Sequence, residues 1–354
     1  MNAQFTQHNL IFKQASGTSR GVLTTKETYL LEISKNGQKG IGECAIFRGL
    51  SYDDVPDYEE KLTWLCENIN LDFEVLKKEL LHYPSIIFGL EQALLNLEHG
   101  EDLYFPSDFT DGKDSIKING LIWMGNADFM QSQIEEKLAK GFDCIKLKIG
   151  VDWKSEKEII KKLREKFPKE QLELRVDANG AFSYEEASMV LQELADLGIH
   201  SIEQPIKKSE VRSPKSEENS EKKSTDCCIP WNKMARLCAE TPTPIALDEE
   251  LIGIIDFEEK KKLLETIKPQ YIILKPALVG GFSGSDEWIA IAESLGINWW
   301  ITSALESNIG LNAICQYTYT KKNPLPQGLG TGALFTNNFE THLQLEGDQM
   351  WHKK

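Results

Sequence analysis

Five ionisable side chains stand where apolar, strand-like runs of the sequence end: Lys148, Asp177, Glu203, Asp248 and Lys275. Most neighbours in this series are about 26–29 residues apart, close to the length of one strand–helix unit. Because the carboxyl ends of parallel strands meet at one edge of a sheet or barrel, we expect the five side chains to lie close together. The sequence therefore predicts three clustered carboxylates between two lysines.

The three carboxylates indicate a metal site. Clustered anions repel and raise one another's pKa unless a cation lies between them. A single acid at a strand end more often caps the following helix, but three acids at successive strand ends favour a shared ligand. Hard oxygen ligands with open positions for water or substrate suit Mg²⁺, with Mn²⁺ as an alternative. We therefore predict that Asp177, Glu203 and Asp248 bind this metal.

The two lysines are expected on opposite sides of the metal. Of the eight parallel strands expected after residue 115, Lys148 ends the second and Lys275 ends the sixth. Lys146 points the same way as Lys148, since side chains along a strand alternate with a period of two. The metal and the charge of Lys146 would lower the pKa of Lys148 and make it a candidate general base. This arrangement suits removal of a proton next to the carboxylate of a small-molecule substrate, with metal and cation stabilising the enolate.

A regular alternation of strands and helices, which starts near residue 115, must position these residues. The expected strands are residues 115–123, 144–149, 172–176, 201–203, 244–247, 271–275, 298–302 and 327–331. The expected helices are residues 127–139, 154–167, 183–197, 231–240, 257–266, 285–295 and 309–319. Eight such strands predict a closed (β/α) barrel of the TIM type, an α/β fold with its active site at the carboxyl ends of the strands. An open doubly wound sheet would need a glycine-rich phosphate turn after its first strand, and none is present.

The first 114 residues have a different texture. Residues 5–48 alternate like antiparallel strands, and Asn36-Gly37 between two strand-like runs is a strong hairpin signal. Residues 16–21 have the composition of a loop, whereas residues 56–100 carry apolar side chains at helical spacing. Strands followed by helices predict an α+β domain over residues 1–114.

Two further segments depart from the barrel pattern of residues 115–333. The gap between Glu203 and Asp248 is longer than one unit, and residues 207–228 within it are rich in Lys, Glu and Ser. We predict that these residues form a charged surface insertion. The tail, residues 334–354, shows little helical or strand pattern, and we expect it to pack on the first domain.

Composition limits the possible partners and compartments. The chain of 354 residues is 41% hydrophobic and 27% charged, which is typical of a globular protein. A net charge of −15 argues against a nucleic-acid partner, which would need a basic face. No apolar run approaches the roughly 20 residues that span a bilayer, and no secretory leader is visible, so we expect no membrane partner. Scattered cysteines indicate a reducing cytoplasm. The lone histidines His82, His99 and His200 are expected to pack or lie at the surface, and His8, His342 and His352 lie near the termini. The sequence does not predict the oligomeric state.

The motifs together resemble the enolase superfamily, in its muconate-lactonising subgroup. They are Lys146-Leu147-Lys148, Asp177-Ala178-Asn179, Glu203-Gln204-Pro205, Asp248-Glu249, Lys275-Pro276 and Gly280-Gly281. The resemblance covers nearly the whole chain and implies a modified barrel with an N-terminal capping domain. It also implies that the three acids bind Mg²⁺ and that the two lysines act as acid and base.

Three other segments narrow the resemblance to the dehydratases of menaquinone biosynthesis within this subgroup: residues 18–23, 42–45 and 302–307. This resemblance implies that Lys148 removes the α-proton and then protonates the departing hydroxyl on the same face, while Lys275 stays cationic. The implied substrate contacts are Arg20, Asn179, Ser303 and the backbone near Gly330.

Other functions remain as alternatives. In dipeptide epimerases of the subgroup both lysines exchange protons, and an Asp-x-Asp pair at the eighth strand holds the substrate ammonium. Residues 327–332 read Gln-Gly-Leu-Gly-Thr-Gly, so a buried ammonium would lack its partner at a cost of about 1–3 kcal/mol or more. Racemases of N-acylamino acids escape this test, and that activity stays open. A non-catalytic binding protein would be expected to lose a ligand or a lysine, and none is lost; nucleotide-binding glycine motifs are absent.

Overall fold

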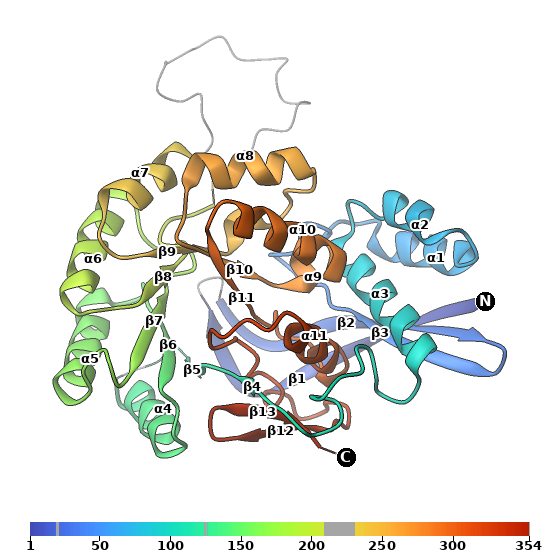
Figure 1. Cartoon of the computed structure of the whole chain (residues 1–354), viewed down its shortest axis with the longest axis horizontal. Coiled ribbons are helices and arrows are strands. Elements are labelled where there is room, and N and C mark those ends of the chain that lie inside the picture. Colours follow the sequence, from blue (N-terminus) through green and yellow to red (C-terminus); the bar gives the residue numbers. More distant parts are fainter. Residues whose placement is uncertain (19–20, 124, 126, 209–230, 354) are drawn as a thin grey trace, which may run out of the picture.

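The computed structural model describes residues 1–18, 21–123, 125, 127–208 and 231–353. Figure 1 shows a small antiparallel sheet with its helices on one side and a larger curled parallel sheet ringed by helices on the other. The predicted α/β architecture with an N-terminal α+β region is confirmed, and the exact domain boundaries at residues 114 and 333 remain predictions. Within the described residues, every helix is too short or too polar to cross a bilayer.

The N-terminal sheet has the order β1-β2-β3 and is antiparallel. Its strands are β1 (Asn2–Thr18), β2 (Gly21–Lys35) and β3 (Gln38–Cys44), and its helices are α1 (Tyr58–Asn68), α2 (Phe73–Glu79) and α3 (Pro84–His99). The predicted hairpin is confirmed: Lys35 pairs with Gln38, and Asn36 and Gly37 both have positive φ. A Cβ atom on Gly42 would lie 2.0 Å from the Gly89 carbonyl oxygen, so α3 can lie against β3 only because Gly42 is a glycine.

The prediction of a loop over residues 16–21 is wrong for residues 16–18 and for residue 21. The strands continue to Thr18 and resume at Gly21, and these two residues pair with each other. Small polar residues suit a loop locally, but here residues 16–18 pair with residues 21–23 of the neighbouring long strand. Residues 19–20, and with them Arg20, lie outside the described residues.

The larger sheet is parallel with the order β11-β10-β9-β8-β7-β6-β5. Its strands are β5 (Gly120–Ile122), β6 (Cys144–Lys148), β7 (Glu173–Asp177), β8 (Ser201–Glu203), β9 (Ile245–Leu247), β10 (Tyr271–Leu274) and β11 (Asn298–Ile301). The prediction of an eighth strand over residues 327–331 is wrong. Only Gln327 and Gly328 form bridges, to Ile118 beside β5 and to Thr302 after β11. A Cβ on Gly328 would lie 2.1 Å from Thr302 Oγ1, so the close approach of these two segments requires a glycine at this position.

Helices cover the outer face of this sheet (Figure 1). They are α4 (Ala127–Ala139), α5 (Trp153–Lys166), α6 (Tyr184–Asp196), α7 (Asn232–Glu240), α8 (Phe257–Ile267), α9 (Pro276–Val279), α10 (Gly281–Ser294) and α11 (Asn308–Thr320). Asp152, Ser183, Asp256 and Ser307 cap helix N-termini by accepting backbone N–H groups. The apolar faces of these helices pack on the sheet to form the main core. The short α9 and the early start of α10 were not predicted.

The prediction that the tail lacks strands is wrong. The strands β12 (Leu343–Glu346) and β13 (Gln349–His352) form a hairpin, and β13 pairs with β4 (Ile116–Lys117). The sequence missed this hairpin because its strands are short and take their stability from a partner far away in the chain. The start of the tail also contacts the first sheet, where Phe335 bridges Phe12.

Most of the predicted insertion, residues 209–228, lies outside the described residues.

Candidate active site

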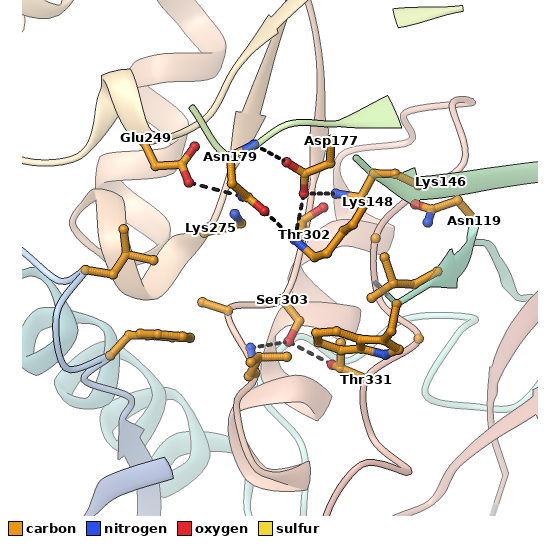
Figure 2. Close-up of a pocket in the computed structure, with 18 residues that line it drawn as sticks. Asn119, Lys146, Lys148, Asp177, Asn179, Glu249, Lys275, Thr302, Ser303 and Thr331 are labelled. Atoms are coloured by element: carbon orange, nitrogen blue, oxygen red, sulfur yellow. Dashed lines mark hydrogen bonds and ion pairs between the residues drawn. The ribbon is translucent and has the colours of Figure 1, made fainter. Parts of the chain in front are cut away.

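The predicted ionisable residues lie together at the carboxyl end of the parallel sheet. In the register of neighbouring strands, Lys148 is the partner of Asp177, and Asp177 is the partner of Glu203. Asp248 and Lys275 directly follow β9 and β10. Figure 2 shows Lys146, Lys148, Asp177 and Lys275 converging on one cavity. Sequence spacing therefore located these residues correctly in space, and their roles remain predictions.

Lysine ammonium groups lie between the carboxylates. Lys148 Nζ donates to Asp177 Oδ2 at 2.9 Å, and Lys146 Nζ donates to Glu203 Oε2 at 2.6 Å. Lys275 Nζ donates to Asp248 Oδ2 and lies 3.7 Å from Glu203 Oε1. All three acids are at most 2% exposed. Buried charges of this kind are stable only because each one has an opposite charge within contact.

The electrostatic balance differs between the two ends of the cluster. Burial alone would raise the pKa of Asp177, but Lys148, Lys146 and Lys275 outweigh burial and hold it below its ordinary value. Burial raises the pKa of Asp248 well above its ordinary value, because Glu249 and Glu203 add to the effect and Lys275 opposes it only in part. Burial lowers the pKa of Lys275, but Asp248 and Glu203 reverse this and keep the ammonium charged. The Asp248 end is therefore short of positive charge.

The donor set fits a hard divalent cation. Within the described residues, Glu203 Oε1 is buried and accepts no hydrogen bond, although it lies at the centre of the cluster. Three carboxylates supply oxygen ligands of the kind that Mg²⁺ prefers. Among the described residues, a separate group of three potential metal ligands lies outside this cluster. It consists of Asp102, His342 and His352, whose ligand atoms lie within 4.8 Å of one another.

The turn after β7 holds Asn179 over the cluster. Asn179 and Gly180 have φ values of +44° and +74°, a left-handed conformation that asparagine and glycine adopt most readily. The Asn179 side chain accepts a hydrogen bond from Lys148 Nζ at 2.7 Å and donates one to Glu249 Oε1 at 3.1 Å. Asn179, a predicted substrate contact, therefore also orients Lys148, a link that the sequence did not indicate.

Gln204, in the motif that follows β8, supports the turn that carries Asp248. Gln204 Oε1 accepts the backbone N–H groups of Asp248 and Glu250 at 3.3 and 3.2 Å. This fixes the turn that carries Asp248. The sequence did not predict this role for Gln204.

The cavity has about 790 Å³ of empty space, including its open mouth. The charged cluster forms one wall, and Phe47, Trp123 and Leu305 contribute to the apolar remainder. Gly330, a predicted contact, also lines it. No acid occurs among the described lining residues beyond Asp177 and Glu249.

Ser303, another predicted substrate contact, is held by three hydrogen bonds. Its hydroxyl donates to Glu306 Oε2 at 2.5 Å and accepts from Thr331 Oγ1 at 2.8 Å and from the Leu305 N–H at 3.1 Å. Figure 2 shows Ser303 and Thr331 side by side on the wall opposite the lysines. Glu306 and Thr331 were missed as individual residues. A buried acid in the apolar run after β11 is a signal that could have revealed Glu306.

Two of the segments that were singled out in the sequence meet between the two sheets. Glu43, at the end of β3, accepts hydrogen bonds from the N–H of Ser307 and the N–H of Gly310, both at 3.0 Å, and from the Thr28 hydroxyl at 2.8 Å. Glu43 thereby caps α11 from the N-terminal sheet. A Cβ on Gly310 would lie 2.7 Å from Glu43 Oε2, which explains the glycine.

Comparisons with known proteins agree with this architecture. A family model described as Enolase C-terminal domain-like matches residues 130–216 and 226–349. The o-succinylbenzoate synthase of Desulfotalea psychrophila (strain LSv54 / DSM 12343) is 41% identical, with 98% of each chain covered.

Solved structures extend the likeness. The crystal structure of MenC from Desulfotalea psychrophila LSv54 matches with a TM-score of 0.83 and 39% identity, covering 99% of each chain. A dipeptide epimerase from Enterococcus faecalis V583, complexed with Mg and the dipeptide L-Leu-L-Tyr, matches with a TM-score of 0.80 over 100% of this chain and 97% of its own. At 18% identity, the second match shows a shared fold only.

Proposed function

Because the chain belongs to the o-succinylbenzoate synthases of the enolase superfamily, we propose that Lys148 is the base of its dehydration and Lys275 the opposing cation. The activity is that of a hydro-lyase in menaquinone biosynthesis. The substrate is 2-succinyl-6-hydroxy-2,4-cyclohexadiene-1-carboxylate, a small-molecule carboxylate, and the product is o-succinylbenzoate.

The single observation that carries the assignment of roles is the position of the two lysines. Lys148 ends β6 and Lys275 follows β10, which lie four places apart in the sheet order, so their ammonium groups reach the cavity from opposite sides. Asn179 and Asp177 hold Lys148, whereas Asp248 holds Lys275. The reaction requires Lys148 as a neutral amine, which can take one proton, and Lys275 as an ammonium, which can face the developing negative charge.

In the proposed reaction, the C–H bond next to the carboxylate breaks and the proton passes to Lys148 Nζ. The electron pair spreads into the carboxylate, where the Lys275 ammonium faces the added negative charge. The pair then forms the new ring double bond as the C–OH bond breaks. Lys148 returns its proton to the departing hydroxyl on the same face. One water molecule leaves, and the ring becomes aromatic.

Asp177, Glu203 and Asp248 would hold Mg²⁺. The burial of all three acids, the absence of a hydrogen bond to Glu203 Oε1 within the described residues and the raised pKa of Asp248 support this set. A related epimerase structure contains Mg. A bound Mg²⁺ would supply Lewis-acid stabilisation of the substrate carboxylate. Mn²⁺ offers similar oxygen coordination and is expected to substitute.

We assign substrate contacts to Asn179, Ser303, the backbone at Gly330 and, from the sequence alone, Arg20. Ser303 and Gly330 lie on the wall that faces the lysines, where the succinyl group has room. The scarcity of acids on this wall suits a substrate without an ammonium group and disfavours a dipeptide. An ammonium group there would lack its counter-charge.

Ultraviolet absorbance tests the proposal directly, because the cyclohexadiene turns into an aromatic product. We expect Mg²⁺-dependent turnover that Lys148→Ala abolishes, with Mg²⁺ binding intact by calorimetry. Lys162→Ala, an exposed lysine on α5, is the matched control and should keep wild-type activity. Appreciable turnover by Lys148→Ala would remove Lys148 from the base role.

Racemisation of N-acylamino acids is a second candidate activity. Both lysines reach the cavity, so protons could exchange on either face of a substrate whose amine carries an acyl group. Proton exchange of an N-succinylamino acid in D₂O, followed by NMR, measures it. Loss of exchange in either Lys148→Ala or Lys275→Ala is expected; exchange in both variants would contradict this role.

A further inference from the structure

A second cluster of potential metal ligands lies away from the active-site cavity. Asp102 follows α3, His342 precedes β12 and His352 ends β13, so three distant parts of the chain meet here. His342 Nδ1 lies 2.6 Å and His352 Nε2 lies 3.0 Å from Asp102 Oδ2. None of the three residues lines the active-site cavity. The sequence gave no hint of this cluster, since the histidines looked isolated.

The hydrogen-bond pattern of the cluster is unbalanced. Both imidazole nitrogens converge on one oxygen, Asp102 Oδ2, while Asp102 Oδ1 is buried and has no hydrogen-bond partner among the described residues. If the two imidazoles only donated hydrogen bonds to Asp102, one to each carboxylate oxygen would leave neither oxygen without a partner. One potential ligand atom from each residue lies within 4.8 Å of the other two, close enough for a single metal ion to bind all three.

We propose that Asp102, His342 and His352 bind a divalent transition-metal ion of the Zn²⁺ class. Two imidazoles and one carboxylate are ligands that Zn²⁺ takes readily, whereas Mg²⁺ prefers oxygen ligands alone. Tetrahedral bonds of about 2.0–2.1 Å place ligand atoms about 3.3 Å apart. The cluster must therefore open by about half an ångström. The His342 side chain, 44% exposed, can make this movement and leaves a position open for water.

The surrounding structure holds the other two ligands in place. The Asp102 carbonyl accepts hydrogen bonds from Asn312 Nδ2 at 2.9 Å and from Gln316 Nε2 at 2.8 Å, both on α11. The His352 side chain is fully buried beside the Phe109 ring, with a centroid distance of 5.9 Å. A preformed carboxylate and a fixed imidazole lower the cost of binding.

An ion here would join the C-terminal hairpin to the segment after α3. Without the ion, the pairing of β13 with β4 attaches the hairpin to the rest of the sheet. Only Gln349 and Met350 of β13 take part in this pairing. Binding to the folded state alone stabilises a protein by mass action. The site is therefore expected to control the stability of the C-terminal hairpin and not the chemistry of the active site.

Elemental analysis tests the proposal on the full chain. The protein is dialysed against excess Mg²⁺, which occupies sites made of oxygen ligands, then incubated with Zn²⁺ and freed of unbound metal. We expect about one Zn²⁺ per chain in the wild type and in His99→Gln, an exposed histidine at the end of α3 that serves as the matched control. We expect His342→Gln to lose this ion and to keep its dehydratase activity.

Thermal unfolding provides a second readout. Zn²⁺ should raise the Tm of the wild type in a concentration-dependent way, and His342→Gln and Asp102→Asn should both lose the rise. Circular dichroism without zinc shows whether each variant folds. Equal zinc content in wild type and His342→Gln, or the same Tm rise in both, would overturn the proposal. Loss of zinc in Asp248→Asn instead would assign the ion to the active site.

Discussion

Glu91 on α3 carries a charge that the fold should penalise, and the penalty can be measured. Its side chain is buried and accepts the N–H of Phe282 at 2.5 Å and of Ser283 at 3.2 Å, in the first turn of α10. Burial raises the pKa of Glu91 from 4.5 to about 7, although those hydrogen bonds and Lys77 act in the opposite direction. The folded protein therefore binds a proton at Glu91 more tightly than the unfolded chain does.

The sign of the pH dependence follows from this difference. Where the folded pKa of an acid is raised, stability falls as pH rises between the two pKa values, here from about pH 4.5 to about pH 7. One pKa unit corresponds to about 1.4 kcal/mol, so the full loss is about 3 kcal/mol of unfolding free energy. Glu91→Gln keeps the shape and one acceptor oxygen but cannot ionise. We expect it to match the wild type near pH 4 and to exceed it above pH 7 by up to about 3 kcal/mol.

Urea unfolding of both proteins at a series of pH values, followed by circular dichroism, measures this difference. Every other titrating group is shared, so its contribution cancels between variant and wild type. Glu98→Gln, an exposed residue on the same helix, is the control and should show no pH-dependent difference. A Glu91→Gln difference that stays constant with pH, or that falls as pH rises, would refute burial as the dominant cause.

Three further predictions address the metal, the packing and the substrate. Asp248→Asn should raise the Mg²⁺ concentration for half-maximal activity by about tenfold or more, and an unchanged Mg²⁺ titration would argue against this ligand. Gly42→Ala should lower the unfolding free energy by about 1–3 kcal/mol or more, because its Cβ would lie 2.0 Å from the Gly89 oxygen; an unchanged urea midpoint would contradict the tight packing of α3. Ser303→Ala should raise KM by about tenfold, as expected for one lost hydrogen bond, with a smaller effect on kcat; wild-type kinetics would remove Ser303 from the substrate contacts.

The sequence predicted best where function depends on local pattern. A charged residue that ends an apolar strand must lie at the carboxyl edge of the sheet, so the positions of Lys148, Asp177 and Glu203 followed from spacing alone. The helix limits were close for the same reason, because amphipathic period and capping residues are local signals.

Errors occurred where an element depends on a distant partner. The tail hairpin, the continuation of β1 through residue 18 and the bridge at Gln327 are each set by pairing with residues far away in the sequence. Short polar or glycine-rich segments have no periodicity that reveals such a partner. The sequence therefore predicted too much strand at residues 327–331 and too little at residues 343–352.

The sequence by itself determined that three acids and two lysines gather at one end of the parallel sheet, since their residue types and spacing follow from the pattern of the strands. Only the tertiary structure decided what surrounds them: Asn179 against Lys148, Glu306 behind Ser303, and Glu43 joining the two sheets. Only it brought Asp102 to His342 and His352. Such contacts depend on the closure of long loops, and the free energy that favours closure comes from packing across the whole molecule and not from the residues that meet.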